Sequence, residues 1–308
     1  MALIKRHRAV GALAIFLALS SGQAWSQDKP AVLMFDDSMD TVSGARMRLG
    51  FERLPAENEH PVWTDGSLAD DVAVALLAGG GLVGGGIAEA RKQEQRNDSI
   101  APLRQAMERG DRLRLLIDTA LEGAVRGQGY TITQTVRSNS LSQGAVSRIL
   151  TKPEDGMGIA VQRTPAVQLV TLSWDNRQLF LAMDLRFYKH GGGVRMPIRE
   201  KGRRVVRYVG PQSPTGVDPL AYWSAQDGTA FLAQVELGLQ HLLPLVWDET
   251  LDIPNVSRKD TTMLQIGQGV QTFPGRLWKQ EGGYAYLYNK DGGVTVVATE
   301  PAQVAAGQ

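Results

Sequence analysis

The glycine run in ALLAGGGLVGGGIAEARK, residues 75–92, constrains the fold of this chain more than any other feature. Gly80, Gly84 and Ala88 are spaced four apart, as are Gly81 and Gly85, so each set lines one face of a helix. Glycine costs up to about 1 kcal/mol per residue in a helix, so six glycines are hard to retain unless another surface packs closely against them. The spacing predicts a glycine-zipper helix at 67–92, packed against the chain's own core, a second copy or a lipid-embedded segment.

Three other interpretations of the run are weaker. Gly79, Gly81 and Gly84 match the dinucleotide pattern G-x-G-x-x-G, but amphipathic helices follow instead of a second strand with a terminal acid, and there is no G-K-[ST]. Residues 72–88 carry no charge and approach the shortest length for a membrane span, although few of them are strongly apolar. A flexible glycine-rich loop is the remaining alternative.

The N-terminus has the three-part layout of a secretory signal peptide. A basic region containing Lys5, Arg6 and Arg8 precedes the apolar residues 9–19, and small residues follow. We expect cleavage between Ser26 and Gln27. Without a twin arginine the Sec route is favoured, and the leader predicts a periplasmic location. The apolar run is too short to span a bilayer comfortably.

Composition excludes several classes of function. The precursor has a net charge of +1, and removal of residues 1–26 brings it to −2, so no general attraction to nucleic acid is expected. The absence of cysteine rules out disulfides, thiol catalysis, cysteine-bound metals and a lipid-bearing cysteine. The core alone must therefore hold an exported chain of this kind together.

Hydrophobic periodicity predicts an α+β fold, with helices packed on an antiparallel sheet. Two strands are expected at 29–37 and 45–54, followed by the glycine-rich helix, a helix at 98–109 and a helix that Asp111 caps. A strand at 130–136 precedes a hairpin of 166–174 and 178–188. The remaining predicted elements are a loop at 189–219 that could include one strand, a helix capped by Asp227, and a three-stranded β-meander within 274–299.

The predicted organisation has four parts. A signal peptide occupies residues 1–26, an α+β domain with the glycine-rich helix occupies 27–260, a β-meander occupies 261–300, and a disordered tail occupies 301–308.

No catalytic or cofactor-binding constellation is found. His60, His190 and His241 are the histidines of the mature chain, and none has metal-ligand spacing; His241 fits a helix face better than a ligand position. Asp36, with Ser38 and Asp40, partly imitates a calcium loop or a phosphatase motif, but a polar turn after a strand explains it better. Neither a cofactor nor a metal site is predicted. The basic stretch REKGRRVVR, residues 199–207, fits a solvated hairpin flank, with contact to lipid headgroups or an acidic partner as the alternative.

The stretch from the glycine run through residue 125 resembles a group of uncharacterised, lipoprotein-like proteins of the Gram-negative envelope. The likeness covers about fifty residues and depends on the pattern N-D-x-I-x-P-L-R-x-A, carried here by Asn97, Asp98, Ile100, Pro102, Leu103, Arg104 and Ala106. The hairpin that follows is loosely similar in layout to envelope modules of the TolB or curli-secretion type. The resemblance implies an envelope location but brings no catalytic residues, and this chain lacks the cysteine of the lipoprotein members.

Taken together, these features predict a non-enzymatic periplasmic protein that binds another envelope protein or itself, through the glycine-faced helix and the sheet. A membrane-integral accessory held by residues 72–88 is the first alternative. A periplasmic hydrolase whose acidic residues, such as Asp36, meet only in the fold is the second.

Overall fold

The computed structural model describes residues 29–37, 42–44, 51–52, 100–163, 170–173, 176–193, 196–248, 251, 253–257, 259–266 and 269–300. Several predicted features lie outside these described residues: the signal peptide with its cleavage site at Ser26 and Gln27, the zipper residues Gly80, Gly81, Gly84, Gly85 and Ala88, and the tail 301–308. For these features the sequence predictions stay predictions.

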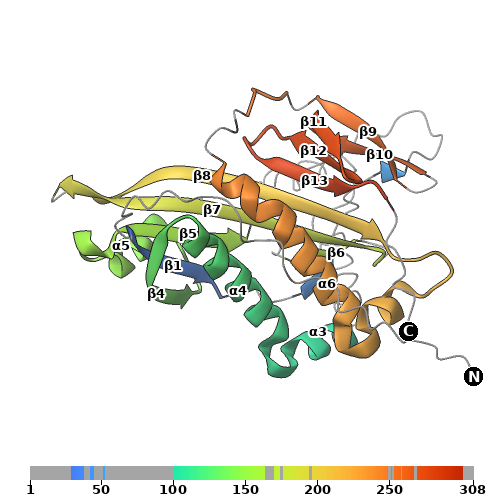
Figure 1. The fold of residues 1–308 in the computed structure, drawn as a ribbon, viewed down its shortest axis with the longest axis horizontal. Helices are drawn as coiled ribbons and strands as arrows, with labels where there is room; N and C mark the ends of the chain where they lie inside the picture. The colour runs from blue at the N-terminus through green and yellow to red at the C-terminus, as the bar shows by residue number, and fades with distance from the viewer. Residues whose placement is uncertain are drawn as a thin grey trace, which may run out of the picture.

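The chain has the predicted mixed α+β fold, in which helices cover one face of a large, mostly antiparallel sheet (Figure 1). The strands of this sheet are β1 (Lys29–Asp36), β2 (Val42–Gly44), β4 (Tyr130–Ser138), β5 (Met157–Arg163), β6 (Val170–Leu172), β7 (Gln178–Gly193), β8 (Met196–Gln212), β11 (Arg276–Glu281), β12 (Tyr284–Tyr288) and β13 (Val294–Ala298). Their order is β11-β12-β13-β8-β7-β5-β1-β4, with β6 pairing beside β7 and β2 beside β6. A smaller sheet has the order β3-β10-β9 and contains β3 (Phe51–Glu52), β9 (Thr261–Ile266) and β10 (Gly269–Pro274).

The four described α-helices are α3 (Ala101–Glu108), α4 (Arg112–Gly127), α5 (Gln143–Ile149) and α6 (Pro219–Trp247). Short 3₁₀ turns follow α3 at Arg109–Asp111 and precede β5 at Pro153–Asp155. None of these described helices combines the length and the apolar character that crossing a bilayer requires. Residues 72–88, the predicted alternative membrane segment, lie outside the described part of the chain.

Strand alternation divides the apolar side chains between the two faces of the sheet. One face carries Leu33, Val161, Leu185 and Val296, which pack with the apolar sides of α3, α4 and α6. The opposite face has two smaller clusters. Val32, Met34 and Tyr188 pack against α5 near one end of the sheet, and Phe180, Val209 and Leu287 pack against β9 and β10 near the other end. The fold therefore has a helical layer on one side and two separate covers on the other.

Helix α6 is the longest of the described helices and lies close against β7 and β8 at Gly238. A Cβ at that position would stand 2.4 Å from Leu181 Cδ1 and 2.7 Å from Tyr208 Cδ1, so any larger residue would force these side chains to shift. The helix begins after Asp218, whose side chain accepts a hydrogen bond of 2.7 Å from the Ala221 amide.

Two predicted helix caps are wrong. α6 begins at Pro219 and is divided by a non-helical break at 225–228, so the amphipathic segment predicted to follow Asp227 does begin there, but Asp227 has a φ of 55°. Asp111 also has a positive φ of 52°, and its side chain makes no capping hydrogen bond to α4. A capping residue needs an extended backbone, and the left-handed conformation of both aspartates removes that geometry.

The predicted loop at 189–219 is also wrong, because most of it belongs to the β7–β8 hairpin. The composition of that stretch, rich in glycine, proline and charge, hid an antiparallel pairing that runs from Gln178↔Gln212 to Gly193↔Met196, with three register shifts along it. The shorter predicted hairpin is confirmed, with β6 and β7 paired at Val170↔Leu181.

The predicted C-terminal meander is confirmed as β11, β12 and β13. Its first turn uses Gly282 and Gly283, whose φ angles are 58° and 79°, as a tight hairpin turn requires. The meander joins the large sheet through the parallel pairing of β13 with β8, from Val294↔Val206 to Val297↔Val209.

Candidate functional site

The β7–β8 hairpin brings together a group of charged side chains that the sequence did not explain. Antiparallel register pairs Asp184 with Val205, Arg186 with Arg203 and Tyr188 with Glu200. All of these side chains lie on the face opposite α4 and α6, since Leu185 and Phe187 between them pack on the helical side. One sheet face therefore presents an acid, two arginines, a tyrosine and a second acid in consecutive positions.

Asp184 is the centre of this group and is almost completely buried, with 1% of its surface exposed. Its carboxylate accepts two hydrogen bonds of 2.8 Å from Nε and Nη2 of Arg203 and one of 3.1 Å from Nη2 of Arg186. The Arg186 guanidinium also lies 3.8 Å from Glu200. The bidentate geometry and the burial make this a strong charge-assisted network.

The electrostatics of the network favour its charged form. Hydrogen bonding to Asp184 raises the pKa of Arg203 above its usual value, and this effect outweighs burial. Burial alone would lower the pKa of Arg186, but the Asp184 carboxylate more than compensates and the net pKa is raised. Burial raises the pKa of the Tyr188 phenol, which Arg186 partly opposes. The arrangement suits ion pairing and positioning better than proton transfer near neutral pH.

Two buried nitrogen atoms of β7 have no hydrogen-bond partner within the described part of the chain. They are Arg186 Nε and His190 Nε2, on side chains four residues apart along the strand. Buried polar atoms are normally paired, so these two are the positions of this sheet face with spare hydrogen-bonding capacity.

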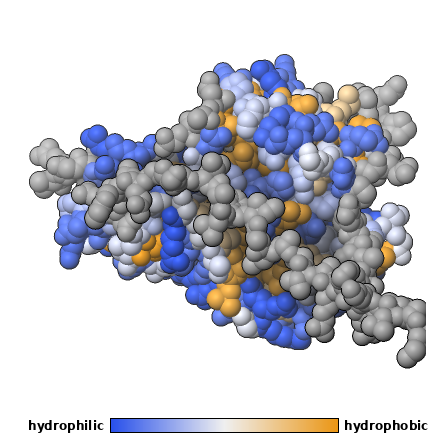
Figure 2. Space-filling view, viewed as in Figure 1, coloured by the Kyte–Doolittle hydropathy of each residue, from blue (hydrophilic) through white to orange (hydrophobic). Residues whose placement is uncertain are grey.

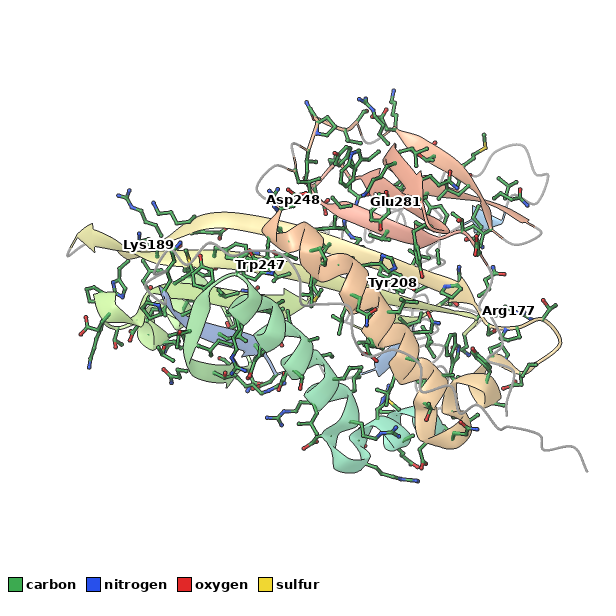
Figure 3. All side chains as sticks on the ribbon, in the orientation of Figure 1. Arg177, Lys189, Tyr208, Trp247, Asp248 and Glu281 are labelled. Atoms are coloured by element: carbon green, nitrogen blue, oxygen red, sulfur yellow. The ribbon has the colours of Figure 1, made fainter. Side chains whose placement is uncertain are left out.

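The outer part of the hairpin carries a second, unbalanced group of charges. Lys189 of β7 lies directly opposite Arg199 of β8, and both side chains are exposed, as is Lys201. No described carboxylate forms an ion pair with these three side chains, which we call the cation row. Figure 3 shows Lys189 near the end of the hairpin, beyond Trp247 and Asp248. Like charges directly opposite each other destabilise a strand pair, so the cation row is not explained by sheet stability.

The other basic residues of the 199–207 stretch have structural partners. Arg203 binds Asp184, Arg204 donates a 3.2 Å hydrogen bond to the Asp248 carbonyl at the end of α6, and Arg207 binds the carboxylate of Asp291. Burial would raise the pKa of Asp291, but Arg207 and the Gly293 amide together hold that pKa below its usual value. The structure thus divides the basic stretch into three structural arginines and two exposed cations, Arg199 and Lys201.

His241 occupies an aromatic cluster between α6 and the meander. Its Nδ1 lies 3.2 Å from the Tyr286 hydroxyl, and its ring centroid lies 3.9 Å from that of Tyr284. The ring is also parallel to that of Tyr208 at 6.2 Å. Burial lowers the pKa of His241, although Glu281 opposes the shift. His241 therefore packs as a neutral side chain of the helix–sheet contact near neutral pH, on the helix face where the sequence placed it.

The remaining residues singled out in the sequence do not converge. Asp36 ends β1 beside Ser138 of β4, whereas Ser38, Asp40 and His60 lie outside the described residues. Within the residues that the structure describes, no group of three His, Asp or Glu side chains could hold a metal ion.

Sequence reasoning missed Asp184, Arg186 and Arg203, although one signal was present. In QLFLAMDLRFY, residues 178–188, Asp184 interrupts an otherwise apolar strand and an arginine follows two positions later, on the same face. A buried acid in a strand requires a cation as its partner. That this partner is Arg203 follows from the pairing register of β7 and β8, which cannot be read from the sequence.

Comparison with models of known protein families and with curated proteins finds no match to this chain.

Proposed function

We propose that this protein is an exported, non-enzymatic component of a cell envelope that acts by binding another envelope component. The observation that carries the proposal is the cation row, Lys189, Arg199 and Lys201, which remains exposed while the neighbouring charges of the hairpin are matched. The predicted signal peptide supports the location.

Two pairs of like charges in this hairpin differ in their surroundings. The pair Arg186↔Arg203 would also repel, but Asp184 lies beside it and Glu200 faces Arg186. The pair Lys189↔Arg199 has the same cross-strand geometry and no such compensation among described residues. An anionic partner would supply the missing charge to these exposed cations.

The glycine run is the second surface of the proposal. Gly80, Gly81, Gly84, Gly85 and Ala88 would allow close approach of a helix from a partner or a second copy. Gly84→Leu should weaken any self-association in sedimentation velocity runs. Unchanged association would show that the glycine run is not a binding surface, and the cation row would then be the one proposed surface.

Export is tested by the mass of the mature protein. Expression of the full chain in a Gram-negative host should yield a periplasmic product beginning at Gln27. Leu17→Arg in the apolar region of the leader should keep the precursor in the cytoplasm. A cytoplasmic product that begins at Met1 in the unaltered chain would refute the export part of the proposal.

Binding is tested by co-sedimentation of the purified mature chain with isolated envelope fragments. The double variant Lys189→Glu/Arg199→Glu should lose most of the binding. The charge-matched control Lys259→Glu/Lys290→Glu, on the segments before β9 and between β12 and β13, should keep it. Equal binding by both variants would refute the role of the cation row.

A further inference from the structure

We propose that the cation row binds the phosphate groups of an anionic lipid surface. This inference rests on the proposed function, because it requires an exported chain beside a membrane, and it goes beyond that function by naming the chemistry of the partner.

The geometry of the row favours an extended ligand. The register aligns Ala31, Met157, Lys189 and Arg199 across β1, β5, β7 and β8. Adjacent strands are about 4.8 Å apart, so this line covers roughly 14 Å. Lys29 precedes Ala31 by two residues on the same face and is also exposed. Ala31 and Met157 are apolar, so the cations of this end are Lys189 and Arg199 on β7 and β8 and Lys29 on β1. They are spread across the end of the sheet instead of converging on one point.

The position of the row favours a ligand that approaches from outside. On β7, Trp247 of α6 covers Phe187, and the two rings pack at 5.2 Å, whereas Lys189 two residues further along the strand is exposed. The hairpin continues past the ends of α4 and α6, and neither of these two helices covers its closed end (Figure 1). Lys189 and Arg199 therefore stand on a projecting rim.

Cations are present on both sides of this rim. Arg148 of α5 and Lys152, which precedes the turn at 153–155, are exposed on the α5 side, where Gln143 donates a 3.3 Å hydrogen bond to Ile198 of β8. The acids of the region are Glu154, Asp155 and Glu200. Glu200 faces Arg186, whereas Glu154 and Asp155 form no ion pair with a described residue, and Asp155 accepts only the backbone amide of Lys152. Figure 2 shows this end of the molecule, on the left, as mainly hydrophilic.

A planar anionic surface fits this distribution better than an acidic protein segment. Cations on both sides of a thin rim can approach one plane together, whereas a peptide strand would contact one side. Each lysine or arginine close to an anionic membrane strengthens binding by about fivefold. Reversing two charges should therefore weaken binding by more than about 25-fold, with a strong dependence on salt.

The test uses the mature full-length chain and two kinds of vesicle. The first contains phosphatidylcholine with about one third phosphatidylglycerol, and the second contains phosphatidylcholine only, at low ionic strength. We expect sedimentation with the anionic vesicles only, a loss of more than about 25-fold for Lys189→Glu/Arg199→Glu, and retention for Lys259→Glu/Lys290→Glu. Circular dichroism of both variants checks that they fold.

Competition separates the sources of the anion. Inorganic phosphate at matched ionic strength should not displace the protein from the vesicles, and poly-glutamate should compete weakly. Displacement by dilute phosphate would mean a small-anion site and overturn the lipid assignment, as would tighter binding to poly-glutamate than to vesicles. If the protein does not bind vesicles but still binds envelope fragments through the cation row, the lipid inference is wrong and the proposed function stands. If it binds neither vesicles nor envelope fragments, both the lipid inference and the proposed function are wrong.

Discussion

The carboxylate of Asp184 and the guanidinium of Arg203 face each other across β7 and β8 and share two hydrogen bonds of 2.8 Å. Asp184 is buried, whereas 43% of the Arg203 side chain remains exposed. The acid therefore depends on partners that are themselves partly hydrated, and it also separates the like charges of Arg186 and Arg203. This relationship holds the middle of the hairpin together and leaves the cation row as the part of β7–β8 without a balancing charge.

Asp184→Asn should lower the free energy of unfolding by about 3 kcal/mol, because it leaves two arginines side by side without their acid. Urea unfolding followed by circular dichroism measures the change. The double variant Asp184→Asn/Arg203→Met removes the repulsion as well and should be more stable than Asp184→Asn alone. A loss below about 1 kcal/mol for Asp184→Asn would show that the network contributes little.

Two glycine-to-alanine changes should have opposite signs. Gly238→Ala places a methyl group 2.4 Å from Leu181 Cδ1 and should destabilise the protein by about 1–3 kcal/mol. Gly123→Ala, inside α4 with no heavy atom within 4 Å of the new Cβ, should stabilise it by up to about 1 kcal/mol. Thermal unfolding of the pair provides the measurement. Stabilisation by both changes would mean that α6 does not lie against the sheet at Gly238.

Acid should weaken the helix–sheet contact through His241. Its pKa is lowered in the folded chain from the usual 6.5, so the unfolded chain takes up the proton first as the pH falls. This residue therefore reduces stability progressively below about pH 6.5, down to its folded pKa, and has no effect at higher pH. His241→Gln should flatten the dependence of unfolding free energy on pH in that window. An unchanged profile would indicate that His241 is hydrated in the folded protein.

The sequence predicted those elements whose signals are local. The strands of the meander were found because paired glycines and an Asp-Gly-Gly turn separate short aromatic and β-branched runs. Helix α4 was found because Leu113, Ile117 and Leu121 recur at helical spacing, and all three are buried.

The long β7–β8 hairpin was only half predicted because its outer part is exposed on the face opposite α5, beyond Phe187, while Tyr188 and Ile198 are buried against α5. Strand prediction uses the alternation of apolar and polar residues, and Lys189 and Arg199 occupy positions where no core requires an apolar side chain. Likewise, the left-handed break at Gln226 and Asp227 is set by the meeting of α6 with α3, where Gly228 lies against Met107. Such tertiary constraints override local capping signals.

The candidate site was hidden for the same reason. Arg199, Arg203 and Arg207 are equivalent in the sequence, and only the strand register assigns Arg203 to Asp184 and Arg207 to Asp291. Once the arginines with acidic partners are assigned, the exposed cations Arg199 and Lys201 remain.

Site-specific photo-crosslinking in living cells tests the central claim, that the cation row binds an envelope component. A benzophenone side chain in place of Lys201 should add mass to its peptide after irradiation, and the same group in place of Lys259 should not. Introducing Lys189→Glu/Arg199→Glu should abolish the adduct at position 201. Adducts of equal yield at positions 201 and 259, or an adduct at 201 that survives the charge reversal, would contradict the account.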